Sequence, residues 1–137
     1  MAKAIPNCTH ISEWNISTSS FVSHQKGTDV NNFTINDGVG YMVYVEGDTV
    51  FEVNGIEILP VTMSLQQGWN SIGWFNETST DAESLAQNVT NCTAIAYWNN
   101  TLCRFITHPV GTNISNFVVE RGDGCLVYVT SETTWIQ

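Results

Sequence analysis

Short stretches of alternating apolar and polar residues follow one another along most of the chain, and Gly, Asn or Pro separates them. Alternation with a period of two and enrichment in Val, Ile, Thr, Tyr and Trp indicate β-strands. In the C-terminal half, this pattern predicts strands over residues 93–98, 104–108, 116–120 and 125–130. Residues 57–65 and 68–75 predict two more strands, and Pro60 places the first of them at an edge or a bend. The pattern therefore predicts a mainly β protein.

One segment has the periodicity of a helix instead. Its apolar residues recur at i, i+3, i+4 and i+7, namely Ala82, Leu85, Ala86 and Val89. Just before this stripe, Thr80 and Glu83 have the spacing of a capping box, in which the hydroxyl and the carboxylate satisfy backbone donors of the first turn. The expected fold class is thus mainly β (α+β), with one short helix that packs its apolar stripe on a sheet.

The chain contains an internal repeat. Shifted by 84 positions, residues 7–53 align with residues 91–137 without a gap, and 18 of the 47 pairs are identical. Such self-similarity indicates duplication of one structural unit. We therefore expect two related antiparallel β-meanders. Residues 1–56 form a first repeat that lacks the leading strand and helix, and residues 57–137 form a complete second repeat.

Each repeat has a Gly-X-Gly step ahead of its last strand, from Gly38 to Gly40 and from Gly122 to Gly124. Both glycines of each step are expected to supply the positive φ of a tight turn. The tripeptide Arg121-Gly122-Asp123, which some adhesion receptors bind, lies within the second step. Because it coincides with the repeat's own turn, we interpret it as a turn rather than as a receptor ligand.

The charge of the chain excludes several partners. Four Lys and Arg oppose 13 Asp and Glu, which gives a net charge of −9, so phosphate backbones and anionic membrane surfaces are repelled. A hydrophobic content of 42% with 5 Trp favours a packed core over disorder. No apolar run is long enough to span a bilayer, and residues 1–6 do not resemble a secretory signal, so we expect any signal or anchor to lie outside this sequence.

Asparagine acceptor sites for glycosylation are unusually dense. Eight Asn-X-Ser/Thr sequons occur, whereas 14 Asn and 27 Ser plus Thr placed at random predict roughly three. The predicted acceptors are Asn7, Asn15, Asn32, Asn76, Asn88, Asn91, Asn99 and Asn113. A Thr-rich β sequence also generates some sequons by chance, but the excess favours a glycosylated extracellular surface.

The four cysteines fit the same compartment, because disulfides persist outside the reducing cytosol. Three pairings are possible. We favour Cys103 with Cys125, which lie at the edges of neighbouring predicted strands and are special to the second repeat, and then Cys8 with Cys92. The second pair joins repeat equivalents, and it can equally form between two chains.

No residue pattern indicates catalysis or metal binding. His24 and His108 are repeat equivalents, whereas catalytic pairs usually need unlike surroundings, so we interpret both as solvent-facing or turn-capping. No Cys or His has the spacing of a zinc site, and the acidic turns do not match a dedicated calcium loop, so neither metal nor cofactor is expected. The repeated strand positions of Trp14, Trp98 and Trp135 favour core packing over sugar stacking.

Several motifs together resemble a known module. These are residues 65–73 with Gly68-Trp69-Asn70, the short helix, the aromatic end Tyr97-Trp98, and the strand 120–129 with its Gly-X-Gly step. They resemble a small β-rich repeat of archaeal and bacterial cell-surface proteins, including S-layer-like and sheath-like envelope proteins. Residues 65–137 cover one unit, and residues 7–53 cover a second without its Gly-Trp-Asn strand and helix. Cys125 and Leu126 stand where the family usually has an aromatic pair.

The resemblance implies a structural surface role with no catalytic residue to carry over. We therefore expect an extracellular, glycosylated subunit that self-assembles into a cell-surface layer, sheath or filament. Its partner is a further copy of itself, bound through edge strands. The alternative is a carbohydrate- or protein-binding adhesion module of a larger surface protein.

Overall fold

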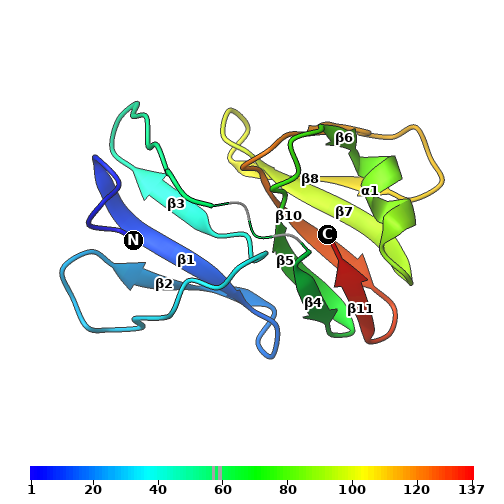
Figure 1. Cartoon of the computed structure of the whole chain (residues 1–137), viewed down its shortest axis with the longest axis horizontal. Coiled ribbons are helices and arrows are strands. Elements are labelled where there is room, and N and C mark those ends of the chain that lie inside the picture. Colours follow the sequence, from blue (N-terminus) through cyan, green and yellow to red (C-terminus); the bar gives the residue numbers. More distant parts are fainter. Residues whose placement is uncertain (57, 59) are drawn as a thin grey trace.

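The computed structural model describes residues 1–56, 58 and 60–137, and it confirms a mainly β fold with antiparallel sheets and one short helix. Figure 1 shows the two main sheets lying beside each other, with the first repeat in blue and cyan. The first sheet has the order β2-β1-β3. Its strands are β1 (Cys8–Asn15), β2 (Ser20–Gln25) and β3 (Met42–Val45).

The second sheet has four strands in the order β5-β10-β7-β8, and two short ladders, β4 with β11 and β6 with β9, accompany it. The sheet strands are β5 (Gly68–Gly73), β7 (Cys92–Asn99), β8 (Arg104–Pro109) and β10 (Gly124–Val129). The ladder strands are β4 (Thr62–Leu65), β6 (Thr80–Asp81), β9 (Val118–Val119) and β11 (Thr133–Ile136). The helix α1 (Ala82–Asn88) packs against β7.

The first hairpins of the two repeats fold alike. β1 and β2 pair with Trp14 opposite Phe21, and β7 and β8 pair with Trp98 opposite Phe105, in the same register. Every non-glycine residue with positive φ has a repeat equivalent that shares this conformation, as Asn7 (56°) does with Asn91 (62°). An L-residue rarely adopts this region without local support, so the shared strain points to one duplicated backbone plan.

Each repeat has its own apolar core. The larger core lies between the second sheet and α1, and its members include Leu85, Ile95 and Val127. A smaller cluster in the first repeat is formed by Ala2, Ile5, Cys8 and Ile11. Full burial of a side chain such as Leu85 contributes about 1.5–3 kcal/mol, so the second repeat holds most of the hydrophobic stabilisation.

The apolar stripe of α1 is confirmed, because all four of its predicted residues are buried. The predicted capping box is wrong. The N-cap is Asp81, whose carboxylate accepts a hydrogen bond from Ser84 N at 2.9 Å, and Thr80 belongs to β6. Glu83 does not fold back onto the first turn, because its carboxylate is bound by His108 and Gly111 of a neighbouring segment.

The Gly-X-Gly prediction is half right. Gly38 and Gly122 have φ of 77° and 96°, whereas Gly40 and Gly124 have no positive φ. Gly40 is needed for a different reason, because a Cβ at this position would lie 2.5 Å from the backbone oxygen of Ile72 in β5. This glycine therefore allows the first repeat to approach the second closely.

Three strand predictions are too long by two residues or more. The strand predicted over residues 68–75 ends at Gly73. The strand predicted over residues 116–120 is only Val118–Val119, because its partner β6 is equally short. The strand predicted over residues 57–65 is observed only from Thr62 to Leu65, and residues 57 and 59 lie outside the described part. The first repeat also forms fewer strands than its copy, since the equivalents of β9 and β11 are not strands there.

Candidate functional site

The first sheet ends in an open edge, by which we mean the outer side of β3 (Met42–Val45). Its repeat equivalent β10 lies between β7 and β5, and both neighbours pair with it. β3 pairs with β1 on one side, and among the described residues no strand pairs with its other side. Edge strands present backbone donors and acceptors that another chain can bind, so this edge is the leading candidate interface.

Side chains at the open edge are correspondingly exposed. Val43 and Tyr44 are 41% and 61% exposed, whereas the equivalent Val127 is fully buried and Tyr128 is half-buried. The chain after β3 continues with more exposed apolar side chains, namely Val50, Val53, Ile56 and Ile58. Part of this stretch is equivalent to β11, which pairs with β4 in the second repeat. At Val43 and Tyr44 the first repeat thus exposes side-chain surface that its copy covers more fully at Val127 and Tyr128.

The two repeats meet at an aromatic junction. Phe21 and Phe105, which are repeat equivalents, stack with their ring centroids 6.0 Å apart and their planes within 2°. Trp14 packs edge-on against Phe21, and its indole Nε1 donates to the Trp69 carbonyl of β5 at 2.7 Å. Hydrogen bonds from β5 to the carbonyls of Gly38 and Gly40 add to this contact.

A cleft of about 1050 Å³ lies next to the junction, and both repeats line it. Tyr44, Tyr97, Trp98 and Phe105 give it an aromatic wall. Trp98 is 37% exposed, so the prediction that it is a core residue is wrong, whereas Trp135 is buried as predicted. The cleft is the part of the molecule that would suit stacking on a sugar ring.

The second repeat contains a close pair of titratable side chains, the buried His108 and the partly exposed Glu83. His108 is completely buried, and its Nε2 lies 2.7 Å from the Glu83 carboxylate while its Nδ1 lies 2.8 Å from the Ile114 carbonyl. Both neighbours accept hydrogen bonds, so the imidazolium form satisfies both ring nitrogens. The bond from His108, together with the Gly111 N–H, holds the pKa of Glu83 below its ordinary value.

The two histidines are therefore not alike. The prediction that both are solvent-facing or turn-capping is wrong about exposure for His108, which is buried, but its Nδ1 bond to the loop carbonyl agrees with the turn-capping alternative. In both repeats Nδ1 donates to a carbonyl six residues ahead, that of Val30 for His24 and that of Ile114 for His108. This bond fixes the loop after the second strand of each repeat. Only the second repeat adds a carboxylate, and sequence spacing gave no signal for it because Glu83 and His108 are 25 residues apart.

All four cysteines are free thiols in the structure. Cys8 and Cys92 lie in different cores, and each donates its thiol to the carbonyl two residues ahead. Cys103 is exposed at the turn between β7 and β8, whereas Cys125 is buried in β10. Burial raises the pKa of the Cys125 thiol to about 12, with a further contribution from the Asp123 carboxylate. Both disulfide pairings stay predictions.

None of the predicted glycosylation acceptors is buried. Asn15 and Asn99 are half-buried, and their side-chain oxygens accept hydrogen bonds from the turns that follow. The other acceptors are exposed, namely Asn7, Asn32, Asn76, Asn88, Asn91 and Asn113. Their positions leave room for covalent sugars.

The Arg121-Gly122-Asp123 tripeptide lies in a turn, as interpreted from the sequence. Asp123 N donates to the Glu120 carbonyl, and the Asp123 carboxylate accepts a hydrogen bond from Glu120 N at 2.8 Å. Arg121 contacts the exposed Glu77 at 3.3 Å. Both charged side chains of the tripeptide are thus used within the second repeat.

Comparison of the chain with family models, with curated proteins and with solved structures gives no match. Within the described ranges, no three His, Cys, Asp or Glu side chains converge as a metal site. The described helix is too short to cross a bilayer.

Proposed function

We propose that this protein is an extracellular structural subunit, glycosylated and self-assembling through the open edge into a cell-surface layer, sheath or filament. The open edge is the main support for this proposal. β10 is paired on both sides, with β5 and β7, whereas among the described residues the equivalent β3 is paired only with β1. A strand of another copy that pairs with β3 would satisfy its backbone and cover Val43 and Tyr44.

Repeated use of one edge has a geometric consequence. If the edge receives a different surface of the next copy, the contact is head-to-tail and generates an open polymer, whereas an edge paired with itself closes as a dimer. The exposed apolar residues after β3 supply a second surface for such a contact. The sequons on exposed positions support an outward-facing, glycosylated layer.

The test compares oligomeric state in matched variants. Val43→Lys places a charge on the open edge, and Leu102→Lys places the same charge on an exposed apolar residue of the β7–β8 turn. In a concentration series by mass photometry and negative-stain microscopy, we expect multimers for the native chain and for Leu102→Lys, and monomers for Val43→Lys. Monomers of the native, glycosylated chain at every concentration would contradict the proposal.

The aromatic cleft favours a second candidate, a carbohydrate-binding adhesion module. The partly exposed Trp98 face and the polar and aromatic lining suit stacking on a sugar with a few directing hydrogen bonds. A glycan array should then detect a ligand whose binding is lost in Trp98→Ala and kept in Leu102→Ala. An array without ligands, or ligands bound equally by both variants, would remove this candidate.

A further inference from the structure

The sequon at Asn99 lies at the rim of the aromatic cleft. Its chain neighbours on both sides, Trp98 and Asn100, line the cleft, and so do Tyr97 and Cys103. The turn between β7 and β8, yellow in Figure 1, lies on the side of the second sheet that is toward the first. A group attached to Asn99 therefore starts at the cleft.

The atom that would carry a sugar is held at one wall of this cleft. Asn99 Oδ1 accepts a hydrogen bond from Leu102 N at 2.8 Å, and Asn99 Nδ2 donates to the Tyr97 hydroxyl at 3.2 Å. The Tyr97 ring packs against Phe117 with the ring centroids 4.4 Å apart, and both half-buried rings line the cleft. Since an amide nitrogen has two hydrogens, a sugar can replace one of them while the other keeps the bond to Tyr97.

The equivalent sequon of the first repeat has the same backbone without the same wall. Asn15 Oδ1 accepts hydrogen bonds from the turn that follows it, as Asn99 Oδ1 does, but Glu13 stands at the position of Tyr97. In the described part of the chain, the lining of the cleft does not include residues 15–19. Figure 1 shows their turn, in blue, at the opposite side of the view. Asn15 is therefore an internal control for Asn99.

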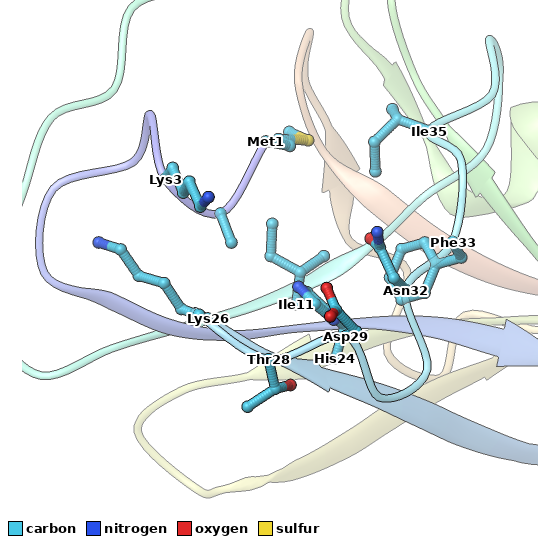
Figure 2. Close-up of a pocket in the computed structure, with 12 residues that line it drawn as sticks. Met1, Lys3, Ile11, His24, Lys26, Thr28, Asp29, Asn32, Phe33 and Ile35 are labelled. Carbon is cyan, nitrogen blue, oxygen red and sulfur yellow. The ribbon is translucent and has the colours of Figure 1, made fainter.

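The charges at the cleft suit a neutral sugar. Asp48 and Asp123 line it, and within the described ranges its lining includes no Lys or Arg. Both lysines of the sequence line a separate pocket of about 250 Å³ in the first repeat, which Figure 2 shows. Arg104 lies opposite Asn99 on β8, outside the lining. Because carboxylates accept hydrogen bonds from hydroxyl groups and repel other acids, the cleft favours neutral hexoses over acidic sugars.

We propose that the aromatic cleft binds the chain's own N-linked glycan at Asn99, with the first sugar packed on Tyr97 and Phe117 and later sugars extending into the cleft. A short tether gives an attached group a millimolar effective concentration, so contacts too weak to hold a free sugar are sufficient. The inference rests on the glycosylation in the proposed function. It gives the cleft a resident ligand, which a free sugar has to displace.

The test uses the chain secreted by a host cell that attaches N-acetylglucosamine-linked glycans, with the occupancy of each sequon measured by glycopeptide mass spectrometry. An endoglycosidase acts on a docked glycan only while the glycan is away from the protein surface, so the cleavage rates at Asn99 and Asn15 report docking within one molecule. We expect cleavage of the folded chain to be about two- to tenfold slower at Asn99 than at Asn15, the range for one aromatic contact. The two rates should become equal in the unfolded chain.

Two substitutions separate docking from crowding at the turn. Tyr97→Leu removes the ring and keeps an apolar side chain, so it should raise the cleavage rate at Asn99 to that at Asn15. Leu102→Ala is the matched control, because Leu102 is an exposed apolar residue of the same turn, and it should change neither rate. Slow cleavage at Asn99 that persists in a folded Tyr97→Leu chain would overturn the proposal.

A second measurement needs no substitution in the cleft. In NMR spectra of the chain trimmed to one N-acetylglucosamine at each site, the sugar protons at Asn99 should be shifted upfield from those at Asn15, because they lie over aromatic rings. The Asn99→Gln chain identifies their signals.

The possible failures are distinguishable. Equal cleavage rates and unshifted sugar protons at an occupied Asn99 would overturn the docking and leave the glycosylated surface standing. A bare Asn99 in a chain that carries sugars at other sequons would do the same. A secreted chain without sugar at any sequon would instead contradict the glycosylated subunit of the proposed function, and the docked glycan with it.

Discussion

Because β10 is paired on both sides and β3 on one side, the same substitution should lower the free energy of unfolding by different amounts at equivalent positions of the two strands. Val127 and Val43 occupy the same place in the two repeats and face Ile95 and Ile11 across the sheet. Truncation to Ala removes two methyl groups, each worth about 0.8 kcal/mol when buried. Val127 is fully buried, so a cavity adds to the loss, and we expect Val127→Ala to destabilise by about 2–3 kcal/mol.

Val43 is 41% exposed, so its truncation to Ala loses less transfer free energy and leaves no enclosed cavity. We expect Val43→Ala to destabilise by less than about 1 kcal/mol. Urea unfolding followed by tryptophan fluorescence measures both, at a concentration at which the chain is monomeric, and the slope m should stay unchanged. Equal losses for the two variants would refute the view that β3 is uncovered while β10 is covered.

Three further predictions follow from close contacts and shifted pKa values. Gly40→Ala should lower the Tm clearly, because the new Cβ would lie 2.5 Å from a backbone oxygen. Gly124→Ala should leave the Tm nearly unchanged, because the atom nearest to its new Cβ is 3.6 Å away. Equal changes in Tm would contradict the close approach of Gly40 to β5. Alkylation followed by mass spectrometry should label Cys103 first and Cys125 only on unfolding, unless the predicted disulfide protects both. The pKa of Glu83 is lowered in the folded chain, so the ionised carboxylate stabilises the fold fully at pH values above its ordinary pKa of 4.5. This stabilisation is lost as the pH falls through the lowered pKa. The Tm of Glu83→Gln should therefore depend less on pH on the acid side than the Tm of the native chain.

The sequence predicted those parts of the fold that depend on local periodicity. The alternation in residues 93–98 predicts one strand and the stripe from Ala82 to Val89 predicts one helix, and both elements are observed. The ungapped offset of 84 also predicted that the repeats share a register, which the equivalent strand pairs show. These features need no knowledge of which segments meet in space.

Features that depend on distant contacts were missed. The Glu83–His108 pair joins a helix to a strand end across 25 residues, and the local spacing of Thr80 and Glu83 pointed to a capping box instead. The ladder of β4 with β11 was missed because its strands are four residues long and 68 or more positions apart. Gly40 was misread since its requirement is the approach of β5, which no local pattern encodes.

The duplication also shows which bonds the loop after the second strand of each repeat needs in order to fold. His24 fixes its loop through Nδ1, and Thr28 donates to the Gln25 carbonyl, just as the equivalent Thr112 donates to the Pro109 carbonyl. These bonds are the same in both repeats, so the loop conformation does not require the carboxylate.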